Sequence, residues 1–318
     1  MKSNNKIPVL VCIDAGGTKT RINIYDLDGV ILNTSLIGVG SPAITKDLEF
    51  LSIDKALKEI FKKFDELYEF KNITMGISGL GVHPDVVPLE RKFKEKFNCP
   101  VYIVNDAIIA LYAVTCQSYS DIINHKEKEG ILVLGGTGSA ICGMKNSKTQ
   151  LIGGWGHIIG EYGSAYSLVH HACQRLIMRF EHSMALLELD KKLLSAFEIN
   201  DPFKLKSIFY LRTKGEIASF ASIISTAALN GDEEALTIMK NEASLIVDGI
   251  IRLVNKQNIE NGSILGFKGG LFKNNKIIPE NVDKMLKEKN LSFNLLIDEQ
   301  DPIIGAYYLS KTKVLMEG

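Results

Sequence analysis

The sequence predicts an α/β protein built from two related domains, with a second half that carries additional helices. Three observations lead to this prediction. With 318 residues, the chain is long enough for two domains of ordinary size. A buried strand, a Gly-Gly-Thr turn and a further strand follow one another twice, first around Gly16 and again around Gly135, which indicates an internal duplication. Residues 163–257 show mainly helical periodicity.

The N-terminal half begins with strands and continues with alternating helices and strands. Residues 7–13 are an unbroken apolar run, which is typical of a buried strand. The next segment alternates apolar and polar residues up to Asp28-Gly29, a hairpin signal, and residues 30–38 continue as a third strand. This antiparallel start differs from the strand–helix–strand start of a dinucleotide-binding fold. The remaining predicted elements are a helix over 46–67, a strand over 72–78, a helix over 87–97, a strand over 101–106 and a helix over 107–116.

A polar stretch at 117–130 is the predicted boundary between an N-terminal domain at 1–118 and a C-terminal domain at 119–318. The C-terminal domain opens with the repeated strand–turn–strand pattern. Its other predicted elements are helices over 163–257, the clearest at 232–257, a strand and helix start over 262–272, a strand over 292–297 and a final helix over 301–315. This last helix could pack back on the N-terminal domain.

Composition and charge argue against several classes of function. Lysine plus arginine and aspartate plus glutamate each total 37, so the net charge of zero gives no sign of a nucleic-acid or anionic-membrane partner. No apolar run reaches the roughly 18 residues that a membrane span needs. The five cysteines stand singly, without the spacing of a zinc or iron–sulfur site, and isolated thiols in apolar surroundings are typical of a reducing compartment. We therefore expect a cytoplasmic protein without a nucleic-acid or membrane partner.

Three glycine-rich turns follow predicted strands: DAGGTKT at 14–20, LGGTGS at 134–139 and FKGGLF at 267–272. A turn of this kind lets backbone N–H groups face a bound anion without obstruction by side chains. Any one of the three, taken alone, is more simply a tight turn. Together, and with two of them repeated, they favour nucleotide binding, although neither the Walker pattern nor GxGxxG is present.

Two acids end predicted strands. Asp14 precedes the first glycine turn, where it could hold Mg²⁺ directly or through water, or could simply cap the turn. Asp106 precedes an apolar helix, where it could be a general base aimed from a strand end or the N-cap of the helix. The sequence leaves both choices open.

The segment GGWGHIIGEYGSAY, at 153–166, is the most unusual part of the chain. It places five glycines, the only tryptophan, a histidine and an acid within fourteen positions. Such a composition indicates backbone that bends tightly or approaches something closely. A lone histidine in a glycine loop is more often structural than catalytic, and we assign no metal to His157.

These motifs, in this order, resemble those of the N-acetylglucosamine kinases. The matching parts are Asp14-x-Gly-Gly-Thr18, ISGLG, VND at Asp106, GGTGS, GGWGHxxGxxGSAY and FKGG, and they extend over essentially the whole chain. These kinases share a branch of the actin/sugar-kinase/chaperone ATPase superfamily with the activator ATPases of benzoyl-CoA reductase (BadF/BadG/BcrA/BcrD type). Within the family, the chain is similar to bacterial kinases of N-acetylglucosamine and N-acetylmuramic acid.

The resemblance implies a duplicated actin-like (ribonuclease H-like) fold, with two domains around a cleft. It implies transfer of a phosphoryl group from ATP, with Mg²⁺, to the 6-hydroxyl of an N-acetylated amino sugar, in amino-sugar or murein salvage. We also expect a homodimer, because the helix-rich region could supply an interface.

The resemblance further implies a role for the first glycine turn. Gly16, Gly17, Thr18 and Lys19 would hold the nucleotide phosphates, and Asp14 would hold Mg²⁺, most simply through a water.

Two other turns would complete the nucleotide site. Gly136, Thr137 and Gly138 would form the second phosphate loop, with Thr137 and Gly138 reaching between nucleotide and sugar. Gly269 and Gly270 would let the adenosine lie against backbone.

Asp106 would be the catalytic base that takes the proton from the sugar hydroxyl. The implied sugar contacts are Ser78, Asp106, Thr137, Gly154, Trp155, Glu161, Ser164 and Ala165.

The chain departs from the family pattern at two places. Relatives commonly carry Asp-Glu after the glycine of GGWGHxxG, where this chain has Glu161-Tyr162, so the acid is one methylene longer. Relatives often place an asparagine against the sugar where this chain has Ser41-Pro42-Ala43. These smaller residues could leave room for the 3-O-lactyl group of N-acetylmuramic acid.

Three other functions are also compatible with the sequence. One is a glucosamine kinase. Another is an activator ATPase of a 2-hydroxyacyl-CoA dehydratase or benzoyl-CoA reductase system, which would need cysteines that bridge an iron–sulfur cluster across a dimer. A third is a non-catalytic sugar sensor on the same fold, which the presence of Asp14, Asp106 and all three turns argues against.

Overall fold

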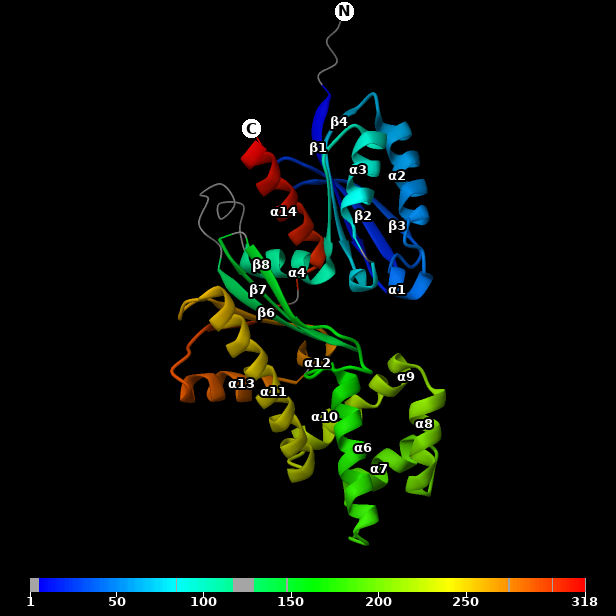
Figure 1. Ribbon diagram of the computed structural model, residues 1–318, viewed down its shortest axis with the longest axis vertical. Helices are drawn as coiled ribbons and strands as arrows, with labels where there is room; N and C mark the ends of the chain where they lie inside the picture. The colour runs from blue at the N-terminus through cyan, green and yellow to red at the C-terminus, as the bar shows by residue number, and fades with distance from the viewer. Residues whose placement is uncertain are drawn as a thin grey trace, which may run out of the picture. The chain divides into compact units, whose positions relative to one another are not determined.

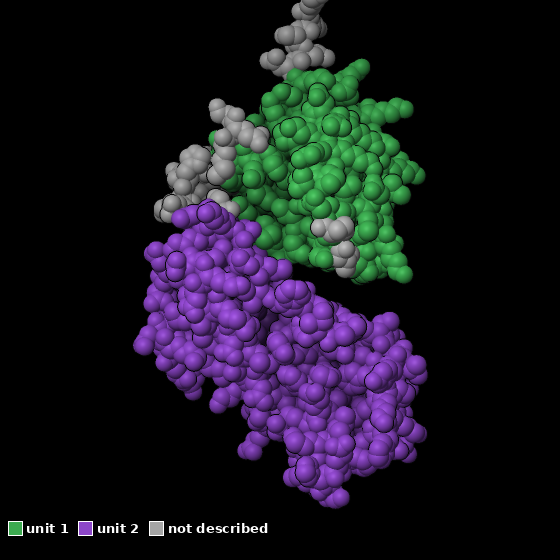
Figure 2. All heavy atoms as spheres, viewed as in Figure 1, with its two compact units in different colours: residues 1–128, 300–318 green, residues 129–299 purple. Residues whose placement is uncertain are grey.

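The structure, a computed structural model, describes residues 6–83, 85–116, 129–146, 148–273, 275–298 and 300–317. The chain divides into two units: residues 1–128 with 300–318 form unit 1, and residues 129–299 form unit 2 (Figure 2). The expected domain boundary at 118/119 lies outside the described residues. The final helix, which the sequence places in the C-terminal domain, belongs to unit 1.

Unit 1 contains a five-stranded sheet with the order β3-β2-β1-β4-β5 (Figure 1). Strands β1, β2 and β3 are antiparallel, whereas β4 and β5 run parallel to β1. The bounds are β1 Ile7–Ala15, β2 Thr20–Asp26, β3 Ile31–Ile37, β4 Tyr68–Ile77 and β5 Val101–Asn105. The central strands are buried because helices cover both faces, as the unbroken apolar run in β1 predicts.

Helices cover both faces of this sheet (Figure 1). Apolar residues of α2 and α3 form one core with β1 and β4. On the other face α14 packs against α4, β1 and β4, and the buried Asn72 amide in β4 donates to the Ser310 carbonyl of α14 at 3.0 Å. The bounds are α1 Pro42–Thr45, α2 Leu51–Phe64, the 3₁₀ turn η1 Leu80–Val82, α3 Val87–Phe97, α4 Asp106–Thr115 and α14 Pro302–Glu317.

Unit 2 repeats the same sheet. Its order is β10-β9-β6-β7-β8, with β6, β7 and β8 antiparallel and with β9 and β10 parallel to β6. The bounds are β6 Gly130–Gly135, β7 Ser139–Lys145, β8 Lys148–Gly153, β9 Ile264–Lys268 and β10 Asn294–Ile297. Because β6 stands where β1 stands in unit 1, the predicted duplication is confirmed by the strand order and directions.

The remaining helices belong to unit 2 (Figure 1). The long helix α11 packs on β7 and β8 and against α6, α10 and α13. The bounds are α6 Ala165–Glu181, α7 Glu188–Ala196, η2 Pro202–Lys204, α8 Leu205–Leu211, α9 Lys214–Ser219, α10 Ala221–Leu229, α11 Glu233–Gln257, α12 Gly270–Lys273 and α13 Ile277–Glu288. Within the described residues, no helix is both long and apolar enough to cross a bilayer.

Some predicted bounds were wrong. The helix expected over 46–67 begins only at Leu51, because Lys46 and Phe50 adopt left-handed backbone conformations with φ of 57° and 52°. The strand expected from residue 72 begins at Tyr68, because pairing with Ile7 of β1 extends it beyond its apolar run.

Candidate functional site

The predicted site residues form two groups, one in each unit. In unit 1 they follow the carboxyl ends of β1, β4 and β5, and in unit 2 those of β6, β8 and β9, an edge of the kind where ligands bind in open α/β sheets.

In unit 1, the first glycine turn joins β1 to β2. Asp14 is half-buried near the end of β1, and the Gly16 N–H closes the turn by donating to the Lys19 carbonyl at 2.9 Å. Gly17, Thr18 and Lys19 are exposed. The turn can therefore present backbone N–H groups, a hydroxyl and an ammonium to a polyphosphate.

Asp106 is the first residue of α4 and follows β5 directly. The helix is capped by Asn105, whose side-chain oxygen accepts from the Ala107 N–H at 2.9 Å, although Asp106 Oδ1 lies 3.0 Å from the same nitrogen. The Ser78 hydroxyl also donates to the Asp106 carboxylate. Because Asn105 already supplies the cap, capping alone does not explain the acid at Asp106.

Burial raises the pKa of Asp106 above the ordinary range of an aspartate, while the hydrogen bonds from Ser78 and Ala107 act in the opposite direction. Ser78 follows β4, and its N–H donates to the Ala15 carbonyl at the end of β1 at 2.9 Å. The ends of β1, β4 and β5 are thus tied together around the acid. A half-buried carboxyl with a raised pKa is suited to accept a proton.

The raised pKa leads to a prediction on pH dependence. If Asp106 is the base, kcat/KM falls as the pH drops through its folded-state pKa. The acid limb of the pH–rate profile should therefore lie at higher pH than it would with an aspartate of ordinary pKa. Ser78→Ala removes a hydrogen bond that stabilises the charged form, which should move this limb to higher pH. The matched control is Ser35→Ala, whose side chain lies in β3 next to Asn33. An unchanged limb in Ser78→Ala would contradict the assignment.

The loop Ser41-Pro42-Ala43 lies beside this group. Ser41 and Pro42 are buried and Ala43 is exposed. A Cβ atom placed on Gly79 would lie 2.8 Å from Ser41 Oγ and 2.7 Å from the Ala43 Cβ, so the loop packs directly against the residue that follows Ser78. The departure from the family pattern therefore lies close to Ser78 and Asp106.

In unit 2, the second glycine turn and the segment 153–166 are joined by backbone contacts. The Gly136 N–H donates to the Gly138 carbonyl at 2.9 Å, and the Gly136 carbonyl accepts from the Ala165 N–H at 2.8 Å. The Ser139 hydroxyl donates to the Tyr162 carbonyl at 2.6 Å. Thr137 is exposed at the tip of the turn.

The third glycine turn meets the second one. Gly269 has φ of 118°, and a Cβ atom placed on it would lie 2.3 Å from the Gly135 carbonyl oxygen. Only glycine permits this approach of two backbones. Gly270 begins α12, and the space beside it is open. The structure thus brings together three of the predicted motifs: the second phosphate loop, the third glycine turn and the segment 153–166, which is called the sugar segment after its predicted role.

Glu161 is the acid of the sugar segment, and it forms an ion pair with Lys214 that the sequence does not predict. Its Oε2 atom lies 2.5 Å from Nζ of Lys214, with 8% of the Glu161 side chain and 27% of the Lys214 side chain exposed. Ser164 caps α6, and its hydroxyl accepts from the Ser167 N–H at 3.0 Å. Gly154 is exposed, and Trp155 is 72% exposed.

A second residue that the sequence does not predict, Glu242, also contacts this segment. Glu242 on α11 is completely buried and accepts from the Gly163 N–H at 2.6 Å and from the Ser167 hydroxyl at 2.8 Å. Nδ1 of His171 lies 2.6 Å from the same carboxylate, which raises the pKa of His171. The start of α6 is therefore held by a buried polar cluster, which favours one conformation of the segment.

Both missed residues left a signal in the sequence. Lys214 occupies the first position of a helix, next to the positive end of its dipole, where a cation is unfavourable. Glu242 interrupts the apolar stripe of α11, between Met239 and Ile246. Each is a local exception that a tertiary contact explains.

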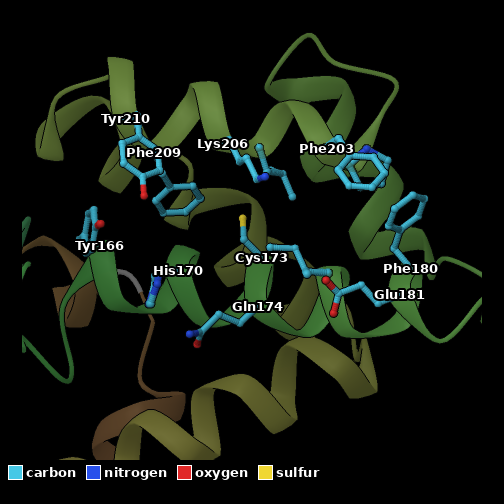
Figure 3. A pocket seen from close by; sticks show the side chains of 13 residues that line it. Tyr166, His170, Cys173, Gln174, Phe180, Glu181, Phe203, Lys206, Phe209 and Tyr210 are labelled. Atoms are coloured by element: carbon cyan, nitrogen blue, oxygen red, sulfur yellow. The ribbon is translucent and has the colours of Figure 1, made fainter.

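One cavity of about 460 Å³ lies between α6 and α8 (Figure 3). It is separate from the glycine turns, and the residues that line it are Tyr166, His170, Cys173, Gln174, Ile177, Phe180, Glu181, Pro202, Phe203, Leu205, Lys206, Phe209 and Tyr210. Tyr166, the last residue of the segment 153–166, packs edge-on against His157 with 5.1 Å between ring centroids. The cavity therefore adjoins the sugar segment through Tyr166.

The donor groups fit a magnesium–nucleotide complex. Asp14 supplies carboxylate oxygens, the ligand type that Mg²⁺ prefers. The Cβ positions of Gly136 and Gly270 are open, so a ligand could approach the backbone there. Among the described residues, no three His, Cys, Asp or Glu side chains cluster as a metal site by themselves.

Comparison with known proteins identifies relatives of the whole chain. Residues 11–310 match the BadF/BadG/BcrA/BcrD ATPase family. An N-acetylmuramic acid/N-acetylglucosamine kinase from Clostridium acetobutylicum is 26% identical over 96% of this chain and 98% of its own length. An N-acetyl-D-glucosamine kinase from Dictyostelium discoideum is 24% identical over 95% and 97%.

Solved structures share the fold. A candidate N-acetylglucosamine kinase from Chromobacterium violaceum superposes with a TM-score of 0.64 at 19% identity, over 96% of this chain and 99% of that chain. A ROK family glucokinase from Streptomyces griseus, in complex with glucose and AMPPNP, gives a TM-score of 0.54 at 18% identity, over 95% and 99%. The predicted actin-like ATPase fold is thereby confirmed.

Proposed function

The chain belongs to the BadF/BadG/BcrA/BcrD ATPase family, and from that premise we propose that it is an ATP-dependent kinase that phosphorylates the 6-hydroxyl of N-acetylated amino sugars. Its two curated relatives, both named as kinases of such sugars, support the sugar class. The observation that carries the proposal is Asp106, a half-buried carboxyl with a raised pKa, which lies at the same sheet edge as the first glycine turn.

In this mechanism, Asp106 orients the sugar hydroxyl and accepts its proton as the oxygen attacks the γ-phosphorus of ATP. Ser78 holds the carboxylate in place and stabilises its charged form. A protein takes part in little covalent chemistry during phosphoryl transfer, so positioning of the two reactants contributes most of the rate enhancement.

The glycine turns supply the phosphate contacts. Backbone N–H groups of the first and second turns, with the hydroxyls of Thr18 and Thr137, would hold the phosphate oxygens, and Lys19 would add positive charge. Mg²⁺, when bound beside Asp14, would neutralise charge on the phosphates. Gly269 and Gly270 would leave room for the adenosine.

The segment 153–166 would hold the sugar. Glu161 would accept hydrogen bonds from sugar hydroxyls, because its nearly buried carboxylate is held in place by the ion pair with Lys214. Ser164 and Ala165 would shape the site for the N-acetyl group at the start of α6. Trp155, whose ring is exposed, would form a wall for the sugar ring together with Gly154.

A screen of substrates tests the proposal. ADP release is measured with glucose, glucosamine, N-acetylglucosamine and N-acetylmuramic acid under the same conditions. We expect the highest kcat/KM with N-acetylglucosamine, and activity with N-acetylmuramic acid as well if Ser41 and Ala43 leave room for the lactyl group. Preference for glucosamine would make the alternative glucosamine kinase correct, and ADP release that no sugar stimulates would contradict the proposal.

The activator-ATPase alternative finds less support. All five cysteines are buried and none is in a disulfide within the described residues, and burial raises the pKa of Cys99 and of Cys173 to about 12. An iron–sulfur cluster shared between two copies of the chain needs exposed thiolates. Iron in the protein purified without oxygen would restore this alternative.

A further inference from the structure

Among the described residues, Lys214 is the only cation that forms an ion pair with Glu161, the acid of the sugar segment. Its Nζ atom lies 2.5 Å from Oε2 of Glu161. Apart from this pairing, the buried Oε2 atom accepts no hydrogen bond within the described residues. The ammonium of Lys214 is therefore the contact that holds this nearly buried carboxylate in place.

The pair also lies directly beneath the second phosphate loop. A Cβ atom placed on Gly138 would lie 2.6 Å from Nζ of Lys214, 2.8 Å from Oε1 of Glu161 and 2.9 Å from Oε2. The loop thus packs directly against the ion pair at Gly138. A shift of the ion pair would therefore displace both the sugar segment and the second phosphate loop.

The local structure offers no other reason for a cation at this position. Lys214 is the first residue of α9, a helix that begins with a capping box in which Thr213 and Glu216 bond each other's backbone N–H groups. A positive charge in the first turn opposes the helix dipole. The contact with Glu161 accounts for the lysine, whereas helix formation does not.

We infer that Lys214 is a positioning residue of the sugar site: it fixes the Glu161 carboxylate against the second phosphate loop, so that one ion pair sets the geometry of sugar recognition. This inference rests on the proposed function. It adds a residue to which neither the resemblance nor the comparisons assign a role. Lys214 acts through Glu161 and is not itself required to touch the sugar.

The test compares Lys214→Met and Lys214→Arg with wild type. Because one partner of a nearly buried charge pair is removed, we expect Lys214→Met to raise the KM for N-acetylglucosamine by about 10- to 100-fold, with a much smaller change in the KM for ATP. Lys214→Arg retains the charge and should recover part of the loss. Lys191→Met, which breaks an exposed pair with Glu188 in the same unit, is the matched control and should behave as wild type.

A double-mutant cycle shows whether Lys214 acts through the acid. In a Glu161→Gln background, Lys214→Met should raise the sugar KM by less than about 3-fold, since the two residues form one unit. An equal cost in both backgrounds, or a wild-type sugar KM in Lys214→Met, would overturn the inference.

Binding measured without turnover separates this inference from the proposed function. Trp155 is the only tryptophan of the chain and lies in the sugar segment, so its fluorescence reports sugar binding. We expect N-acetylglucosamine to change this fluorescence in wild type and to do so at higher concentration in Lys214→Met. Equal titrations in an active wild type and in Lys214→Met would overturn the inference and leave the kinase standing. A wild type that neither binds nor phosphorylates the sugar would overturn both.

Discussion

Asp106→Asn should fold normally and lose activity by about 10²-fold or more in kcat, the usual size of a general-base contribution. An asparagine keeps the shape of the side chain and can still accept hydrogen bonds from Ser78 and Ala107, but it cannot take up a proton at neutral pH. The KM for ATP should change little, because the phosphate contacts are assigned to the glycine turns. Steady-state kinetics measures kcat and the KM for ATP, and a thermal melt of the same preparation shows whether the variant is folded.

The control for this variant is Asp232→Asn. Asp232 also stands at a helix start, where it caps α11 by accepting from the Ala235 N–H at 2.9 Å, but it carries no predicted role in the site. Its kcat should equal that of wild type. Near-normal turnover in Asp106→Asn would remove Asp106 from the mechanism.

Gly269→Ala should have the second large effect, on stability and on ATP binding together. The new methyl group would meet the Gly135 carbonyl oxygen at 2.3 Å, and the φ of 118° is one that alanine rarely adopts. Overpacking and backbone strain together should cost about 2–5 kcal/mol of folding free energy. If the variant relieves this clash, the third glycine turn moves away from the second one. The KM for ATP should then rise at least about 10-fold.

The neighbouring Gly270→Ala is the matched comparison for stability. The space beside Gly270 is open, and it begins a helix, so an alanine there should leave the free energy of unfolding within about 0.5 kcal/mol of wild type. Denaturant unfolding of the two variants measures this difference. Equal stabilities would show that the backbones of Gly269 and Gly135 do not approach as closely as described.

The parts that could be predicted from the sequence are those determined locally. The strands β1 and β2 and the glycine turns appear in the structure because buried strands and tight turns leave clear local patterns. The alternation in β2 does not become alternating burial, since Asn23 and Tyr25 are buried like Ile22 and Ile24. The repeat around Gly16 and Gly135 predicted the duplication, which the matching strand orders of the two sheets confirm.

The parts that could not be predicted depend on tertiary contacts. Strand β8 lies at a sheet edge and carries few apolar residues, so its sequence gives little strand signal. The start of α2 depends on the left-handed conformation of Phe50, which no propensity favours. Lys214 lies 53 positions after Glu161 in the chain, so only the packing of α9 on α6 brings the two together.

The position of the transferred phosphate tests the proposed function most directly. N-acetylglucosamine is incubated with ATP, Mg²⁺ and the purified protein, and the product is examined by NMR for coupling between phosphorus and the sugar carbons. A kinase of the 6-hydroxyl predicts coupling to C6 and its protons, with formation of one ADP per phosphorylated sugar. Phosphate on another carbon, or ADP formed without any phosphorylated sugar, would contradict it.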